Sequence, residues 1–269
     1  MHLSTGTGWT NIKIVVLHKF PVEKAVFIKI GGSLITDKKS GALTVKEKII
    51  SDIGADLADI IEERRVILAN GAGSFGHPVV KRYGIDKNGM NAGGISKVCS
   101  SVDHLNRVIV RSLVEMGIPA VSFPPRSFVY RDSGGNFVLF KEPIANMLKI
   151  GVVPVAYGDL IFDERKGSSV ISGDDIPLLI SDLIDTAVFL IDMPGIINER
   201  GEVVRRMDER HIDILKEDHE VDVTGGILSK VKKGFLLRKI GIRVIISGFS
   251  KKGDIKSALR GELGTELIP

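Results

Sequence analysis

Five short runs of apolar, largely β-branched residues recur along the chain, and each ends at a glycine or a few residues before one. The runs are 26–30, 66–69, 152–156, 187–191 and 244–247. Runs of this length and composition indicate strands that are buried on both faces, because a half-exposed strand alternates apolar and polar residues. Such strands are typical of a parallel sheet.

Helical patterns lie between these runs. Segments 46–63 and 97–116 each place apolar residues on one face at helical spacing, and 174–183 and 227–240 are further candidates. The alternation of strand and helix predicts an α/β fold with helices on both faces of the sheet. We therefore expect a three-layer αβα sandwich with a largely parallel central sheet.

Two β-hairpins are expected to interrupt this alternation. One spans 128–140 and turns at Ser133-Gly134-Gly135-Asn136, and the other spans 160–172 and turns near Lys166-Gly167. We predict one domain over 25–269 that divides into two lobes, one to about residue 165 and one from about residue 166. Residues 1–24 match no element of this pattern and are expected to form a poorly ordered extension.

Composition narrows the class of protein. The chain has 269 residues, with 43% hydrophobic and 26% charged residues, which is typical of a globular enzyme. No apolar run approaches the ~18–20 residues that span a bilayer, and the single cysteine, Cys99, fits a reducing cytosol. The net charge of +4 is spread along the chain without a basic arm. We therefore expect a cytoplasmic protein that binds neither nucleic acid nor membrane.

Two glycine loops follow the first two strands, at Gly31-Gly32-Ser33 and over 71–76. In a parallel sheet, ligands bind beyond the carboxyl ends of the strands, where glycine lets the backbone approach an anion closely. The two loops together indicate a site where two phosphate groups face one another. The chain has no G-x-x-x-x-G-K-[ST] motif, and no acidic residue follows the 71–76 loop at the spacing of a dinucleotide fold.

Lysines and one histidine lie close to these loops in the sequence. Lys29 falls inside the first strand pattern, where it is either an edge-strand lysine or a functional group with a partner at the strand's end. Lys38 and Lys230 follow glycine loops, and His77 closes the second loop. Lysines that converge on a transferring phosphate would neutralise its charge. No lone carboxylate flanks the second loop as a base, which favours a phosphate or phosphonate acceptor over an alcohol.

These motifs occur in an order that resembles the amino acid kinase superfamily, and within it the archaeal isopentenyl phosphate kinases. The resemblance is carried by I-K-I-G-G-S at 28–33, G-A-G-S-F-G-H-P at 71–78, P-V-A-Y-G-D at 154–159, S-G-D-D at 172–175 and D-V-T-G-G at 222–226. His77 is the most discriminating of these residues, since it is shared mainly with isopentenyl phosphate kinases and fosfomycin kinases.

The resemblance implies the amino acid kinase fold and ATP-dependent phosphorylation of isopentenyl phosphate to isopentenyl diphosphate. It also implies Mg²⁺ as a cofactor, a homodimer, an acceptor-side lobe before about residue 165 and a nucleotide-side lobe after it. We expect no metal-ligating side chains, because the histidines show no metal-ligand spacing. The implied catalytic residues are His77, Lys38 and Lys29. The implied nucleotide-binding residues are Lys29, Gly31, Gly32, Ser33, Gly73, Asp174, Gly226 and Lys230. The implied acceptor-binding residues are Ala72, Gly76, His77 and Gly158.

The chain departs from the family at two positions. Relatives carry T-D-V-D-G after the fourth strand, where this chain has I-D-M-P-G at 191–195, and a histidine that often precedes the second loop is here Asn70. The first change puts nucleotide affinity in question. Two alternative functions therefore stay open, a kinase of another small phosphate or phosphonate such as fosfomycin, and a nucleotide-binding regulator without catalysis.

Overall fold

The computed structural model describes residues 23–37, 44–85, 87–212 and 225–269. The expected N-terminal extension therefore lies, except for residues 23 and 24, outside the described residues. Among the helices of the described ranges, none combines the length and the apolar composition needed to cross a bilayer.

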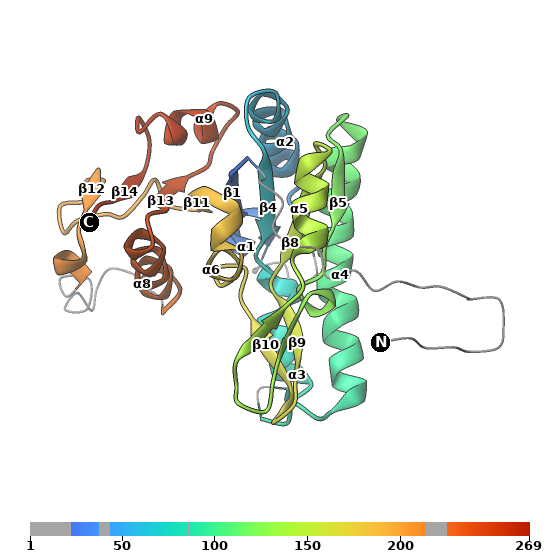
Figure 1. The fold of residues 1–269 in the computed structure, drawn as a ribbon. Helices are drawn as coiled ribbons and strands as arrows, with labels where there is room; N and C mark the ends of the chain where they lie inside the picture. The colour runs from blue at the N-terminus through green and yellow to red at the C-terminus, as the bar shows by residue number, and fades with distance from the viewer. Residues whose placement is uncertain (1–22, 38–43, 86, 213–224) are drawn as a thin grey trace.

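An eight-stranded sheet forms the centre of the molecule (Figure 1), and its neighbouring strands are parallel except for β13 and β14, which are antiparallel. The five apolar runs form β1, β4, β8, β11 and β13, as predicted. In spatial order the strands are β12 (Arg206–Met207), β14 (Thr265–Leu267), β13 (Arg243–Gly248), β11 (Ile184–Ile191), β1 (Ala25–Ile30), β4 (Val66–Asn70), β8 (Val153–Tyr157) and β5 (Ala120–Ser122).

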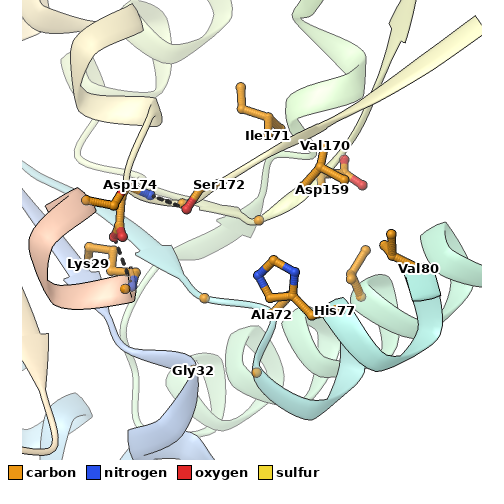
Figure 2. Close-up of a pocket in the computed structure, with 18 of the residues that line it drawn as sticks. Lys29, Gly32, Ala72, His77, Val80, Asp159, Val170, Ile171, Ser172 and Asp174 are labelled. Carbon is orange, nitrogen blue, oxygen red and sulfur yellow. Dashed lines mark hydrogen bonds and ion pairs between the residues drawn. The ribbon is translucent and has the colours of Figure 1, made fainter. Parts of the chain in front are cut away.

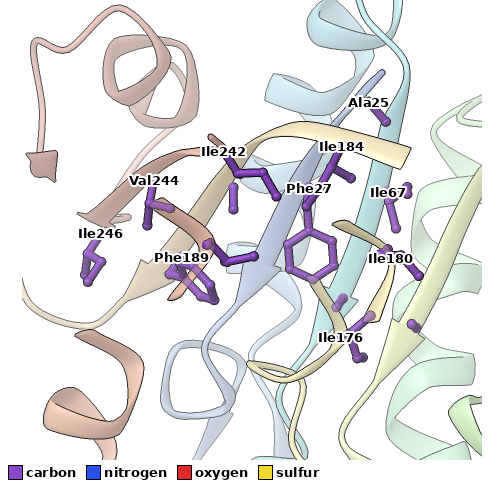
Figure 3. Packing of buried hydrophobic residues seen from close by; sticks show 14 of the residues in the cluster. Ala25, Phe27, Ile67, Ile176, Ile180, Ile184, Phe189, Ile242, Val244 and Ile246 are labelled. Carbon is purple, nitrogen blue, oxygen red and sulfur yellow. The ribbon is translucent and has the colours of Figure 1, made fainter. Parts of the chain in front are cut away.

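Strand β1 shows why the molecule has three layers. Its side chains alternate between the two faces of the sheet, so Phe27 packs in one apolar cluster and Ile28 in the other. Figure 3 shows the Phe27 cluster, where Ile176 of a covering helix lies on the same side as Phe27 of the sheet. Because both clusters are buried, helices must cover both faces, and the predicted αβα sandwich is confirmed.

The helices divide between these two clusters. On the Ile28 side lie α2 (Glu47–Ile61), α4 (Ala92–Glu115) and α9 (Asp254–Leu259). On the Phe27 side lie α5 (Glu142–Lys149), α6 (Ile176–Leu179) and α8 (Gly225–Lys239).

Two predicted helices differ in their bounds. Helix α4 begins five residues earlier than the pattern at 97, because the side chain of Asn91 caps it by accepting the Gly94 N–H at 3.0 Å. The pattern at 174–183 yields only α6 and a 3-10 turn, Ser181–Leu183. The preceding residues Ser172, Asp174 and Asp175 use their polar groups in a turn and in ion pairs instead.

Both predicted hairpins are present and join into a second, four-stranded sheet in the order β10-β9-β6-β7. The strands are β6 (Val129–Arg131), β7 (Phe137–Leu139), β9 (Asp159–Asp163) and β10 (Gly167–Ile171). Strands β9 and β10 extend beyond the edge of the main sheet and lie beside α3 (His77–Arg82) in Figure 1. The main sheet continues across residue 165, and the division into two lobes stays a prediction.

Candidate active site

A cavity of about 540 Å³ lies at the carboxyl ends of β1, β4 and β8, where the sequence predicts ligand binding. It has a charged end with Lys29, Asp174 and Lys230, and an apolar end lined by valine and isoleucine side chains. Figure 2 shows the charged end on one side of Ala72 and His77 with Val80 on the other. The residues of the apolar end are Val80, Val98, Val102, Val170 and Ile171.

At the charged end, Asp174 bridges two buried lysines. Its Oδ1 lies 3.0 Å from the Nζ of Lys29, and its Oδ2 lies 2.7 Å from the Nζ of Lys230. The three residues come from β1, from the turn before α6 and from α8, and each is less than a tenth exposed. Lys29 lies between β4 and β11 inside the sheet, so the edge-strand interpretation is wrong.

The bridge perturbs the charges of its members. Burial alone would raise the pKa of Asp174, but the two ammonium groups outweigh it and lower the pKa to about 2. Burial, together with the nearby charge of Lys29, lowers the pKa of Lys230 to about 8 despite the carboxylate. The cluster therefore holds two positive charges against one negative charge near neutral pH, which favours an anionic ligand.

The two glycine loops face each other, as the sequence predicts. A Cβ on Gly71 would lie 2.7 Å from the nitrogen of Gly32, and a Cβ on Gly32 would lie 2.6 Å from the Cα of Gly73. Thr36 connects the loops, since its hydroxyl donates to the Gly32 carbonyl at 2.8 Å and accepts the Ser74 N–H at 3.2 Å. Only glycine permits this approach, which brings both backbones to one cavity wall.

The second loop needs glycine at two further positions. Gly73 has φ of 51°, in the left-handed region. A Cβ on Gly76 would collide with the side chain of Ala72. Gly158 lies opposite, where a Cβ would be 3.6 Å from the Ala72 nitrogen and 3.5 Å from the Gly173 nitrogen. Backbone nitrogens from two segments thus border one small space, a geometry suited to an anion.

His77 begins α3 and lines the cavity next to this space. Val80 follows one helical turn later, so one short helix presents an imidazole and an apolar side chain to the same cavity. Helix α4 contributes Val98 and Val102 to the apolar end. A ligand with a phosphate beside Ala72 and an apolar tail would match this arrangement.

The structure brings most of the predicted site residues together. The predicted residues that line the cavity are Lys29, Gly32, Ser33, Ala72, Gly73, Gly76, His77, Gly158, Asp174, Gly226 and Lys230. Gly31 is adjacent but does not line it, and its N–H donates to the Leu190 carbonyl at 2.8 Å. Lys38 lies outside the described residues. The divergent segment 192–195 follows β11 and does not line the cavity.

Sequence reasoning missed several polar groups of the site. Asn106 of α4 is buried and donates from Nδ2 to Asn70 Oδ1 at 3.0 Å, directly before the second loop. Lys233, one turn after Lys230, lines the cavity, and its Nζ lies 2.6 Å from Oδ1 of Asp175. Asp159 also lines the cavity, but its carboxylate is paired with an arginine and is not a lone base. Of these residues, only Lys233 could have been found from the sequence, because it lies one turn after Lys230 in the helical pattern of 227–240.

The donor set of the site does not resemble a resident metal centre. In the ranges that the structure describes, no group of three or more His, Cys, Asp or Glu side chains is placed to hold an ion. The carboxylate oxygens of Asp174 face lysines. A divalent cation would therefore have to enter with a phosphate ligand, as Mg²⁺ does in many kinases.

Comparison with known proteins agrees with this geometry. A model of the amino acid kinase family matches residues 24–248. The isopentenyl phosphate kinase of Methanocaldococcus jannaschii is 31% identical, over 89% of this chain and 97% of that protein. The isopentenyl phosphate kinase of Thermoplasma acidophilum is 34% identical, over 86% of this chain and 95% of that protein.

Solved structures agree as well. A crystal structure of isopentenyl phosphate kinase aligns with a TM-score of 0.76 at 26% identity, covering 90% of this chain and 99% of that one. A substrate complex of isopentenyl phosphate kinase aligns with a TM-score of 0.74 at 26% identity, covering 91% and 100%. The chain therefore belongs to the amino acid kinase family and is a homologue of the isopentenyl phosphate kinases.

Proposed function

We propose that this protein transfers the γ-phosphoryl group of ATP to isopentenyl phosphate and so produces isopentenyl diphosphate for isoprenoid biosynthesis. The observation that carries the proposal is the single cavity, in which a lysine-rich, glycine-lined end continues into an apolar end. A phosphate joined to a short hydrocarbon chain has the same two-part chemistry. The relatives at about 30% identity that bear this activity in their names support the same substrate.

The donor in this proposal is MgATP, with Mg²⁺ bound to the nucleotide's phosphates. Lys29 and Lys230 then neutralise charge on the transferring group, and Asp174 keeps the two ammonium groups at a fixed separation. The Gly32 and Gly73 backbones border the same phosphates. Lys38 keeps its expected role beside the transferring group.

The acceptor side needs orientation rather than a base. A monophosphate, with a second pKa near ~6, is mostly dianionic at neutral pH. Its oxygen attacks the γ-phosphorus in line, the bond from that phosphorus to the β–γ bridging oxygen breaks, and ADP leaves. His77 donates a hydrogen bond to the acceptor phosphate, while Ala72, Gly76 and Gly158 border it. This division assigns the acceptor to the lobe before residue 165 and the nucleotide to the lobe after it, with Lys29, Gly32 and Gly73 of the first lobe also reaching the nucleotide's phosphates.

A homodimer and a cytoplasmic location complete the proposal. Val114 and Met116 at the end of α4, and Val121 on the edge strand β5, are exposed apolar side chains that support a contact between copies. The single cysteine supports a reducing compartment. Light scattering on the purified protein tests the dimer, which would be contradicted by a monomer mass at assay concentration.

A coupled ADP-release assay with isopentenyl phosphate and MgATP tests the activity. We expect turnover well above the rate without acceptor, and no increase would refute the proposal. If the assay shows no transfer, calorimetry with MgATP tests the alternative of a nucleotide-binding regulator, which would bind MgATP tightly without phosphorylating an acceptor. Comparison of kcat/KM for isopentenyl phosphate and fosfomycin distinguishes the two kinase functions, because only the first acceptor places a hydrocarbon tail in the apolar end.

A further inference from the structure

Arg126 holds the corner between β8 and β9 at the acceptor side of the cavity. It lies in the 3-10 turn Pro125–Ser127, and its Nη1 donates to both carboxylate oxygens of Asp159 at 2.7 and 2.8 Å. Its Nη2 donates to both oxygens of Asp103 on α4 at 2.6 Å. One guanidinium thus ties the turn, β9 and α4 together through two bidentate pairs.

The backbone of this corner is fixed from other sides as well. The hydroxyl of Tyr157 donates to Asp103 at 2.5 Å, and the N–H of Gly158 donates to the carbonyl of Asn70 at 3.0 Å. Tyr157, Gly158 and Asp159 are consecutive, so every residue of the corner has a partner outside its own strand. This corner carries Gly158, which faces Ala72 across the space for the acceptor phosphate.

The charge of Asp159 makes the guanidinium necessary. The Asp159 side chain is fully buried and lines the cavity in which an anionic acceptor would bind. Burial raises the pKa of this carboxyl to about 6, against the opposing effect of Arg126. Without Arg126, the buried Asp159 would lose the partner that keeps its carboxylate ionised and holds both of its oxygens at 2.7 and 2.8 Å, so the residue next to Gly158 would lose its fixed position.

We propose that Arg126 is a positioning residue for the acceptor, which holds Asp159 and through it fixes Gly158 opposite Ala72 at the wall where the acceptor phosphate binds. The inference rests on the proposed function, because it requires a phosphate acceptor at this wall. It adds a group that does not line the cavity itself and that acts through Asp159 and Gly158.

The location of Arg126 predicts which kinetic constant it controls. The charged end has its own ion-pair cluster of Lys29, Asp174 and Lys230, whereas Arg126 pairs with Asp103 and Asp159. Loss of the guanidinium should therefore weaken the acceptor's binding and leave binding of MgATP nearly unchanged. A merely structural role would lower thermal stability without separating the two KM values.

The test uses the Arg126→Gln variant, the double variant Arg126→Gln/Asp159→Asn and the control Arg243→Gln. Arg243 also has a bidentate carboxylate partner, Glu266, and a backbone partner, but it lies at the opposite end of the sheet, at the start of β13. For each variant, both KM values, kcat and the melting temperature are measured with isopentenyl phosphate and MgATP.

We expect Arg126→Gln to raise the acceptor KM about tenfold or more and to change the MgATP KM less than about twofold. The double variant should keep the raised acceptor KM, because it also lacks the ion pair that holds Asp159 and Gly158 in place. Recovery of the acceptor KM in the double variant would overturn the positioning role and assign the effect to the charge of Asp159. Arg243→Gln should lower the melting temperature and leave both KM values within about twofold of wild type.

Equal changes in the two KM values, or an unchanged acceptor KM in folded Arg126→Gln, would overturn the inference. If Arg126→Gln does not fold, Arg126→Lys takes its place, since a lysine keeps the charge but loses the bidentate geometry. In that case, an acceptor KM and a kcat in Arg126→Lys that both equal the wild-type values would overturn the inference. Wild-type protein that is inactive on isopentenyl phosphate would instead refute the proposed function.

Discussion

The two ends of the cavity are built differently. The charged end depends on three side chains, Lys29, Asp174 and Lys230, that hold each other in place through two ion pairs. The apolar end is lined by five aliphatic side chains from α3, α4 and β10, none of which has a polar partner to satisfy. In the proposed function, transfer chemistry is therefore concentrated in few groups, while acceptor selectivity is distributed over many small contacts.

The largest effect is expected at the charged end. Lys230→Met removes an ammonium group from the transferring phosphate and leaves Asp174 with one partner, so kcat should fall by roughly 100-fold or more. Steady-state kinetics at saturating substrates measure this. Lys239→Met is the matched control on the same helix, because Lys239 is exposed and pairs with Glu209. A decrease in kcat of less than about threefold in Lys230→Met would contradict a catalytic role for the charged end.

His77 lies where the two ends meet, and its loss should be intermediate. His77→Ala deletes one hydrogen bond to the acceptor phosphate, and kcat should fall by about tenfold or more. The helix that carries His77 is short and its backbone is unaffected by the change, so the melting temperature should move little. Unchanged kcat and KM in the folded variant would exclude His77 from the site.

The pH dependence should come from the charged end. The pKa of Lys230 is about 8, well below the value of 10.5 for a free lysine, so the ammonium form is lost as pH rises through 8. The kcat/KM for MgATP should then fall about fourfold between neutral pH and pH 8.5. Bound phosphates favour the charged lysine, so the fall in kcat should begin at a higher pH.

Lys230→Arg provides the control for this profile, since a guanidinium stays protonated throughout the range. The alkaline fall in kcat/KM should move beyond the tested range in this variant, whatever its absolute rate. A wild-type profile that stays flat to pH 9.5 would contradict the assignment of a depressed lysine pKa to this cluster.

The smallest single effect is expected at the apolar end. Val170→Ala removes two methyl groups that line the cavity, and it should raise the KM for isopentenyl phosphate about threefold with kcat nearly unchanged. Val138→Ala, on β7 of the same sheet but outside the cavity, should change neither constant. A lowered kcat in Val170→Ala would contradict the claim that the apolar end affects acceptor binding and only the charged end affects transfer.

Much of this architecture follows from local sequence patterns. Buried strands, amphipathic helices and glycine turns each have a residue pattern that can be read from the sequence alone. For this reason the predictions of the parallel sheet, both hairpins and the two facing loops are confirmed. Lys29 is identifiable because a charge inside an apolar strand requires a partner. His77 is identifiable because it closes a glycine loop.

The residues that sequence reasoning missed have no such local pattern. Arg126 and Asp159 are 33 positions apart, and Asn106 and Asn70 are 36 apart, so only the folded chain brings them together. The boundaries of α6 were wrong for a related reason, since tertiary ion pairs of Asp174 and Asp175 replace the first turn of the expected helix. Periodicity in a single sequence does not indicate which polar side chains pair over long distances in the chain, so such pairs could not be predicted.

The contrast between the two ends is tested most directly by comparing two phosphate acceptors in the same ADP-release assay. Isopentenyl phosphate and methyl phosphate present the same group to His77 and the lysines, and they differ by four carbons at the apolar end. We expect kcat/KM to favour isopentenyl phosphate by roughly 100-fold or more, from burial of those carbons. Equal kcat/KM values for the two acceptors would contradict the account.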